Sequence, residues 1–481
     1  MKNILAFDVG TTSMKCILFD ELFNELCREQ TEYDIESGPD SFAVLDAQCY
    51  YDAFCDCVTA LQKKGFDTSK IDAICFTTQG ETLIPVNKKG EPLSKAIVWL
   101  DARAGEEAAF ISERLGNEKI YGTTGLPEID GALPMAKVLW IKRKACELYR
   151  ETHKFLLLED FLIFKLTGKF VSEKSLQSST GWYDIKNEKL FDEVLELCEI
   201  DAEKFPQIQS CGEAIGKVSQ EVAQKLGFDK NTVVVTGAMD QIASAIGAGN
   251  ICEGIVTETT GTALVLGATV KTPDFNIEEP LTIYKHFDSN YIYMPYFPTA
   301  GIVLKWFRDT IVPYVNKQSS EEGVSSYQLI DEIAMKSPAG SNGVIMKPDF
   351  TNGGSFEGLT LSATINDLSR SVLEGVAYLL RELVEGLEKK GVCIEEIFSL
   401  GGGAYSELWC GIKASVCGRK ISSVRYNQTT ALGAAVLASV AIGCYDSVQQ
   451  AVSQINHQRK TYNPDKGEEK IYEENYYKFR R

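Results

Sequence analysis

The expected fold of this 481-residue chain follows from ILAFDVGTTSMKCILFD, residues 4–20. An apolar run precedes a turn rich in glycine and threonine, and a second apolar run follows, which predicts a β-hairpin. GIVTETTGTALVLGATV, residues 254–270, repeats this layout about half a chain later. The pair predicts a duplicated architecture of two domains that each open with a hairpin. Two unrelated hairpins are the alternative.

Apolar strands alternate with amphipathic helices along the rest of the chain. Strands are predicted at residues 70–80 and 95–101, and a helix at 134–151. A strand, a glycine turn and a helix are predicted at residues 232–249 and again at 394–418. Interleaved strands and helices indicate an α/β fold.

The domain boundary is expected at a glycine-rich crossing about halfway along the chain. We therefore predict an N-terminal domain over residues 1–246 and a C-terminal domain over residues 247–481.

Charge and composition exclude several classes of partner. Lys and Arg number 49 against 67 Asp and Glu, a net charge of −18, which repels nucleic acid and anionic lipid. The most apolar run, residues 431–443, is shorter than the ~20 residues of a membrane span. Asp8 interrupts any signal-peptide core. We expect a cytoplasmic protein without nucleic-acid or membrane partners.

The first hairpin turn combines groups suited to a polyphosphate. A turn at glycine exposes backbone N–H groups, and hydroxyl side chains add donors. The turn is not a Walker A loop, and a plain hairpin turn is an equal alternative from local sequence. Asp8, at the strand end, is the candidate ligand for Mg²⁺. The candidate nucleotide-binding residues here are Asp8, Gly10, Thr11, Thr12, Ser13 and Lys15, and the second hairpin repeats the device with Gly261 and Thr262.

A run of three glycines follows the predicted strand that ends at residue 400. Such a run lets the backbone approach a flat ring or a ribose, and the helix that it opens offers positive potential. Close packing of strand on helix is the alternative. The candidate nucleotide-binding residues here are Gly402, Gly403, Ala404 and Glu407.

Polar residues follow three other predicted strands. Asp240 lies past Gly237, where it could cap the following helix or act as a general base toward a substrate hydroxyl; local sequence favours the cap. A solvated loop is an equal alternative for the other two groups. Candidate substrate contacts are Gln79, Gly80 and Glu81, which follow the strand residues 74–77, and Asp101, which follows residues 98–100.

Taken together, these residues resemble the FGGY family of carbohydrate kinases, within the actin-like ATPase superfamily. Two phosphate loops, at Asp8–Thr12 and Thr260–Thr262, and the adenosine motif at 401–404 carry the resemblance. Residues 132–141 nearly fit the first family signature, departing at Ala132. Residues 354–374 fit the second signature throughout.

The resemblance implies two ribonuclease-H-like domains with a cleft between them and ATP- and Mg²⁺-dependent phosphorylation of a sugar or polyol hydroxyl. It assigns the sugar site and the first phosphate loop to the domain at residues 1–246, and nucleotide binding to the domain at residues 247–481. It makes Asp240 the catalytic base, reversing the local preference for a cap, and Gln241 a substrate contact. Gly301 and Lys305 resemble nucleotide-side positions. Members of the family commonly form homodimers, so the resemblance also implies a possible homodimer.

Substrate choice stays open among ketoses and polyols. Glycerol kinases carry an arginine where this chain has Gly80 and a tyrosine that residues 130–133 lack. The small residues predict a larger pocket and favour a ketopentose such as D-xylulose, with glycerol, a longer polyol or another ketose as alternatives. An actin-like or chaperone-like ATPase without sugar turnover is the remote alternative, and the match at 354–374 argues against it.

Overall fold

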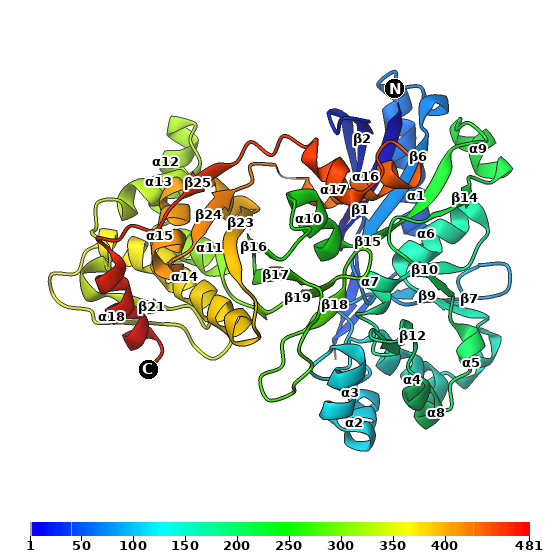
Figure 1. Cartoon of the computed structure of the whole chain (residues 1–481), viewed down its shortest axis with the longest axis horizontal. Helices are drawn as coiled ribbons and strands as arrows, with labels where there is room; N and C mark the ends of the chain where they lie inside the picture. The colour runs from blue at the N-terminus through cyan, green and yellow to red at the C-terminus, as the bar shows by residue number, and fades with distance from the viewer. Residues whose placement is uncertain (1, 40, 427) are drawn as a thin grey trace. The chain divides into compact units, whose positions relative to one another are not determined.

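The computed structural model describes residues 2–39, 41–426 and 428–481, and the chain folds into two compact units (Figure 1). Unit 1 comprises Met1–Ile251, Lys271–Ile292 and Gln428–Ile455. Unit 2 comprises Cys252–Val270, Tyr293–Asn427 and Asn456–Arg481. A single boundary after residue 246 stays a prediction; the structure adds that the chain returns to unit 1 twice.

Unit 1 is built on a six-stranded sheet. In spatial order its strands are β14 (Ala214–Lys217), β15 (Val233–Met239), β6 (Ala73–Thr78), β1 (Asn3–Val9), β2 (Ser13–Asp20) and β3 (Glu25–Glu32). β1 pairs antiparallel with β2 and parallel with β6, which pairs parallel with β15. Every residue of β6 is buried, as expected for a central parallel strand covered on both faces. The hairpin at 4–20 and the strand within 70–80 are confirmed.

Unit 1 also contains helices, some of which contact this sheet. They are α1 (Ala47–Lys63), α2 (Gly105–Leu115), α3 (Asn117–Thr124), α4 (Pro134–Lys144), α5 (Cys146–Glu151), α6 (Leu158–Thr167), α7 (Lys174–Gln177), α8 (Asp192–Cys198), α9 (Gln220–Leu226), α10 (Asp240–Ala248), α16 (Thr429–Ala441) and α17 (Val448–Ser453). Shorter strands are β4 (Glu36–Gly38), β5 (Phe42–Leu45), β7 (Ile84–Val86), β8 (Ala96–Ile97), β9 (Lys154–Leu156), β10 (Val171–Glu173), β11 (Tyr183–Asp184), β12 (Lys189–Leu190), β13 (Gln207–Gln209) and β18 (Ile283–Lys285).

The most apolar run of the sequence forms α16, a core helix that lies against α10 (Figure 1). A Cβ on Gly247 would come 1.9 Å from the carbonyl oxygen of Thr429, and a Cβ on Gly433 would come 1.9 Å from that of Ala243. The two backbones touch only because glycines stand at the crossing. None of the helices in the described ranges is both long and apolar enough to cross a membrane.

Unit 2 repeats the strand order of unit 1. β16 (Gly254–Thr260) pairs antiparallel with β17 (Leu264–Val270) and parallel with β23 (Ile394–Leu400), which pairs parallel with β24 (Lys420–Ser423). β25 (Lys460–Tyr462) borders β24, and β20 (Tyr296–Phe297) borders β17. The hairpin at 254–270 is therefore confirmed, and both units share one topology.

The helices of unit 2 are α11 (Gly301–Thr310), α12 (Tyr314–Glu322), α13 (Ser326–Ala334), α14 (Ile365–Lys389), α15 (Glu407–Cys417) and α18 (Glu469–Phe479), with a 3₁₀ turn η4 (Gly402–Tyr405). The hairpin β21 (Ile345–Lys347) and β22 (Ser355–Glu357) completes it. The second signature opens α14, where Asp367 closes a capping box on Thr364. Buried Glu374 accepts hydrogen bonds from Gly340 N, Ser341 Oγ and Arg370 Nε. These signature residues have structural roles in this chain.

The C-terminal helix α18 is held to α14 by a buried tyrosine face. Tyr472 is 1% exposed, and its hydroxyl accepts from Arg370 at 2.9 Å. Tyr472→Ala removes the ring and one acceptor of a buried guanidinium, so we expect a loss of about 3–5 kcal/mol in the free energy of unfolding. Thermal unfolding measures this loss. Exposed Tyr477 is the matched control, and an equal effect of Tyr477→Ala would contradict the account.

Candidate active site

The carboxyl ends of three neighbouring parallel strands gather the predicted residues of unit 1. Val9 at the end of β1 pairs with Thr78 at the end of β6, and Thr78 pairs with Met239 at the end of β15. Asp8, Gln79 and Asp240 therefore lie at one edge of the sheet, the edge where open α/β sheets bind ligands.

The first hairpin turn is closed by a hydrogen bond from Gly10 N to Ser13 O at 2.9 Å. Tyr33 Oη donates to Gly10 O at 2.6 Å, and Trp99 Nε1 donates to Thr11 Oγ1 at 3.0 Å. Thr12 is exposed and Ser13 half-buried. Sequence reasoning missed both aromatic residues, although Trp99 at the end of a predicted strand was a signal for a site residue.

Asp8 faces Lys15 across this hairpin, with Nζ 3.6 Å from Oδ2. Burial raises the pKa of Asp8, and the positive charge of Lys15 offsets part of that rise. Both side chains are partly exposed, so the Asp8 carboxylate can contact a second cation in addition to Lys15.

Asp240 is the first residue of α10, and the N-cap is Met239. The Asp240 carboxylate accepts a hydrogen bond from the backbone of its neighbour, Gln241 N, at 2.6 Å. The cap interpretation is therefore wrong, because a capping side chain must lie one residue earlier and bond to an N–H further along. Burial, followed by the negative charges of Asp8 and Glu81, raises the pKa of Asp240 to about 7.

Glu81 lies near Asp240 and is one of the charges that raise its pKa. The backbone of Glu81 has a left-handed conformation, with φ at 48°. Burial raises its pKa, and Lys137 opposes the rise. The Lys137 ammonium is fully buried and donates to Glu81 O at 3.1 Å and to Val98 O at 3.0 Å. Lys137 belongs to the first signature, which could have identified it as a site residue. Unit 1 thus brings three interacting carboxylates together: Asp8, Glu81 and Asp240.

Two of the predicted substrate-binding side chains, Gln79 and Asp101, form hydrogen bonds within the protein. Gln79 is buried; its Oε1 accepts from Thr11 Oγ1 at 3.1 Å and its Nε2 donates to Tyr50 Oη at 3.5 Å. Asp101 accepts from Arg103 Nε at 2.8 Å and Ala43 N at 2.7 Å. Burial alone would raise the pKa of Asp101, but these bonds hold it below its usual value. Both residues shape the loop around the site.

Two side chains lie close to Gly80. A Cβ on Gly80 would lie 2.9 Å from Ser179 Oγ and 3.4 Å from Met239 Sδ. Part of the space beside Gly80 is therefore taken up by the protein, and the larger substrate pocket stays a prediction.

In unit 2 the second hairpin turn is packed against the start of α11. Gly261 N bonds to Ala263 O at 2.9 Å, and Ala300 N bonds to Thr262 O at 3.0 Å. A Cβ on Gly301 would come 2.1 Å from Gly261 O, so glycine is required there. Gly261 and Thr262 themselves are exposed. The structure brings Gly261, Thr262 and Gly301 together, while Lys305 lies exposed one turn along α11.

A buried ion pair joins this turn to the glycine run. Glu258 and Lys413 are both 0% exposed, with Lys413 Nζ 2.9 Å from Glu258 Oε1 and 3.0 Å from Thr260 Oγ1. A Cβ on Gly403 would lie 3.4 Å from both Lys413 Nζ and Thr260 Cβ. The pair therefore sets the spacing of the two loops.

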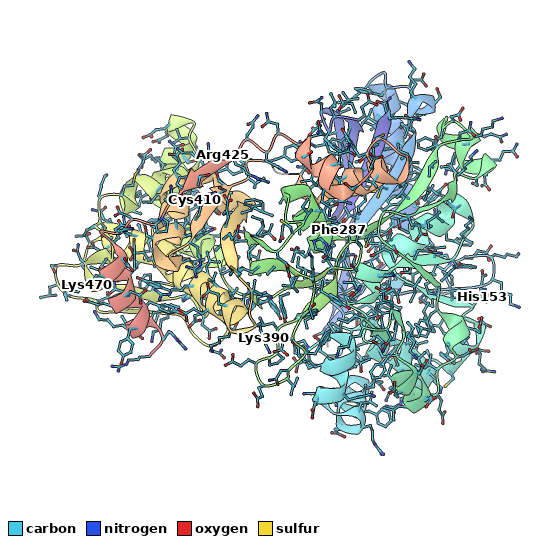
Figure 2. All side chains as sticks on the ribbon, in the orientation of Figure 1. His153, Phe287, Lys390, Cys410, Arg425 and Lys470 are labelled. Atoms are coloured by element: carbon cyan, nitrogen blue, oxygen red, sulfur yellow. The ribbon has the colours of Figure 1, made fainter. Side chains whose placement is uncertain are left out.

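The glycine run leaves β23, passes through the 3₁₀ turn and enters α15, which Ser406 caps. Gly402 is exposed, and Ala404 is buried. Glu407, in the first turn of α15, is exposed and pairs with Lys460 at 2.5 Å and with Arg425 (Figure 2) at 3.2 Å. The hydrogen bond from Lys460 lowers the pKa of Glu407.

The donor set suits Mg²⁺ held mainly by a substrate. Within residues 2–39, 41–426 and 428–481, no group of three or more His, Cys, Asp or Glu side chains could enclose a metal ion. Mg²⁺ in phosphoryl-transfer sites needs only one or two carboxylates, because water and phosphate oxygens supply the other ligands. Asp8 meets that requirement.

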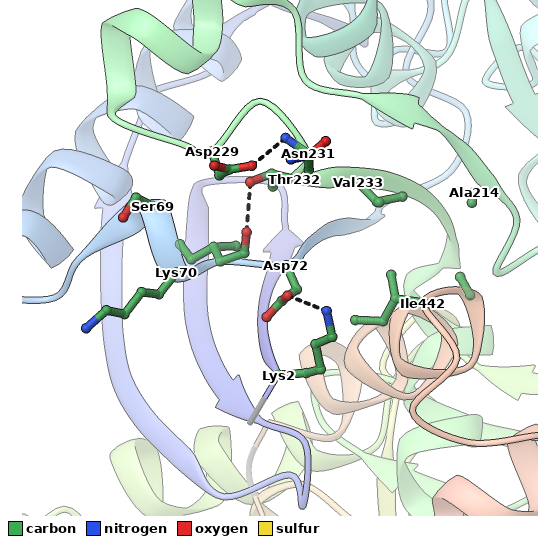
Figure 3. Close-up of a pocket in the computed structure, with 12 residues that line it drawn as sticks. Lys2, Ser69, Lys70, Asp72, Ala214, Asp229, Asn231, Thr232, Val233 and Ile442 are labelled. Atoms are coloured by element: carbon green, nitrogen blue, oxygen red, sulfur yellow. Dashed lines mark hydrogen bonds and ion pairs between the residues drawn. The ribbon is translucent and has the colours of Figure 1, made fainter.

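A separate pocket lies at the opposite edge of the unit 1 sheet (Figure 3). Its volume is about 340 Å³, and it is lined by the segments that precede β6 and β15, including Asp72 and Thr232. Lys2 also lines it and pairs with Asp72 at 2.7 Å. The predicted site residues lie at the other ends of these strands, so this pocket is not part of the site.

Comparisons with known proteins agree with this arrangement. The chain is 25% identical to a xylulose kinase of Staphylococcus xylosus (92% of this chain, 91% of that one) and 27% identical to a gluconokinase of Bacillus subtilis (92% and 88%). The solved structure of a ligand-bound xylulose kinase from Lactobacillus acidophilus has a TM-score of 0.90 at 26% identity, covering 100% of this chain and 97% of that one.

The predicted two-domain actin-like ATPase fold is thereby confirmed. The N-terminal domain of the FGGY family of carbohydrate kinases matches residues 3–247, and its C-terminal domain matches residues 256–442. The chain therefore belongs to the FGGY family of carbohydrate kinases and is a sugar phosphotransferase.

Proposed function

We propose that this chain transfers the γ-phosphoryl group of ATP to a hydroxyl of an uncharged sugar, a ketopentose such as D-xylulose, with Asp240 as the general base. The observation that carries the proposal is the convergence of Asp8, Glu81 and Asp240 at one sheet edge. A base whose pKa lies near 7 accepts a proton readily at neutral pH.

The chain's own groups have distinct roles in this proposal. Asp240 takes the hydroxyl proton as the sugar oxygen bonds to the γ-phosphorus and the bond to the β-phosphate breaks, releasing ADP. The donor side is assigned to the turns at Gly10 and Gly261 and to the glycine run, with Gly301 as their support. Mg²⁺ held at Asp8 would neutralise phosphate charge.

The same carboxylates argue against an acidic sugar. Asp8, Glu81 and Asp240 act on one another electrostatically, and Asp130 adds a fourth negative charge near Glu81. Lys137 is engaged with backbone carbonyls, and Arg103 with Asp101. Lys15 already pairs with Asp8, so each of these three cations has a protein partner, and a bound carboxylate would meet net repulsion from the carboxylates. This favours the substrate of the xylulose kinase relatives over that of the gluconokinases.

A substrate panel tests the proposal. ADP release is measured with ketopentoses, ketohexoses, glycerol, linear polyols and D-gluconate. We expect kcat/KM for the best uncharged sugar to exceed that for gluconate by about 100-fold or more, since like-charge contacts cost several kcal/mol. Glu81→Gln should narrow this ratio, because it removes one negative charge.

The outcomes separate the parts of the proposal. Turnover of gluconate equal to that of the best neutral sugar would refute the charge argument and leave the kinase assignment standing. ATP hydrolysis without any sugar response would refute the proposed function itself.

A further inference from the structure

The strand that leads to Asp240 is irregular just before its end. In the pairing of β15 with β6, the register shifts between Val235 and Ala238. A Cβ on Gly237 would lie 1.6 Å from Phe76 O, so the two backbones are in direct contact there. A bulge interrupts the ladder and re-aims the following residues, and its N–H groups need other acceptors.

Glu159 supplies one of these acceptors. It lies in the first turn of α6, is 0% exposed, and its Oε1 accepts from Gly237 N at 2.7 Å. Within the described part of the chain, its Oε2 has no hydrogen-bond partner. Burying a carboxyl group costs free energy. Among the described residues, the bond from Gly237 N is the one hydrogen bond that Glu159 Oε1 and Oε2 accept in return.

Glu173 supplies the second link through Ser175. Met239 N donates to Ser175 Oγ at 2.9 Å, and Ser175 Oγ donates to Glu173 Oε1 at 2.7 Å. Glu173 is 0% exposed and also accepts from Cys211 Sγ at 2.8 Å. In Figure 1, α6, β10 and α7, which carry these residues, lie beside β15.

We propose that Glu159 and Glu173 are positioning residues that fix the bulge in β15 and thereby aim the Asp240 carboxylate. This inference rests on the proposed function of Asp240. The two carboxylates hold the backbone at Gly237 and Met239, three residues and one residue before Asp240. They bind no substrate, and they act only through the peptide backbone.

The two carboxylates also repel each other. Burial, with the neighbouring charge of Glu173, raises the pKa of Glu159 well above its usual value, and burial likewise raises the pKa of Glu173. Burying two interacting carboxyl groups costs stability. In return, this arrangement provides the hydrogen bonds that hold the backbone of β15 at Gly237 and Met239.

The test separates geometry from general stability. Glu159→Leu keeps the volume and removes the acceptor, whereas Glu159→Gln keeps an acceptor oxygen for Gly237 N. We expect Glu159→Leu to lower kcat by about 100-fold with little change in the KM for the sugar, since a displacement near 1 Å costs about that much. Glu159→Gln should retain kcat within about 3-fold.

Asp160 provides the matched control. It is the next residue of α6, equally buried, and its carboxylate accepts from Leu157 N at 2.8 Å and makes no bond to β15. Asp160→Leu removes the acceptor of Leu157 N as Glu159→Leu removes that of Gly237 N, so it should lower thermal stability while leaving kcat unchanged. Equal kcat losses in Asp160→Leu and Glu159→Leu would overturn the positioning role.

Amide hydrogen exchange gives a readout that needs no activity. Glu159→Leu should increase exchange at residues 236–240 and leave the rest of β15 protected. If Glu159→Leu does not fold, Ser175→Ala tests the second link in the same way, through Met239 N. Unchanged exchange and unchanged kcat would overturn the inference, whereas a wild-type chain inactive on every sugar would overturn the proposed function alone.

Discussion

Asp240→Asn is expected to lower kcat for sugar phosphorylation by about 10³-fold, within the range for loss of a general base. The asparagine keeps the size and the bond from Gln241 N but cannot accept the proton. ADP release with the best sugar of the panel measures the loss, and nucleotide binding should persist because the glycine turns are untouched. Activity within a few-fold of the wild type would refute the catalytic assignment.

The same substitution should stabilise the fold at high pH. The folded pKa of Asp240 is about 7, against 3.8 for the free side chain, so the folded state binds more protons between these values. The free energy of unfolding of the wild type therefore falls as pH rises through that window. Asparagine removes this penalty, by on the order of 1 kcal/mol after allowance for solvent screening.

Thermal unfolding at two pH values checks the sign. We expect Asp240→Asn to raise the Tm relative to the wild type at about pH 8 and to give little difference at about pH 4. A variant less stable than the wild type at the higher pH would show that the carboxylate is not destabilising.

The wild-type activity should show an acid limb near pH 7, because only the deprotonated carboxylate accepts a proton. Glu81→Gln removes a neighbouring negative charge and should move the limb of kcat/KM to lower pH, even where it weakens sugar binding. An unmoved limb would assign the titration to another group.

Lys413→Met is expected to destabilise unit 2 strongly. It leaves Glu258 as an unpaired charge in the core, which costs about 3–5 kcal/mol. For a unit of this size that loss lowers the Tm by on the order of 10 °C. The KM for ATP should also rise, because the pair holds the turn after Thr260 against Gly403.

Two further variants make this prediction specific. Lys413→Met combined with Glu258→Gln removes both charges and should recover most of the lost stability. Lys460→Met breaks the exposed pair with Glu407 and should cost less than about 1 kcal/mol. If the double variant is no more stable than Lys413→Met alone, the unpaired charge is not the cause.

The sequence by itself determined the repeated topology and the family. Both hairpins, the strand before Asp240 and the glycine run follow from apolar periodicity and glycine placement, which are local properties of the chain. The signatures near residues 134 and 354 indicated the class of activity. Each is a continuous stretch of sequence, so it can be recognised without the tertiary structure.

Only the tertiary structure decided which polar residues are free to act. Gln79 and Asp101 follow strands just as Glu81 does. Their side-chain oxygens, however, already accept hydrogen bonds from Thr11 and Arg103. The space beside Gly80 is limited by Ser179, which is distant in sequence. Whether a polar side chain can contact a ligand depends on contacts between segments that are distant in sequence. The local pattern of apolar residues does not predict those contacts. The buried support from Glu159 and Glu173 arises from the same long-range packing.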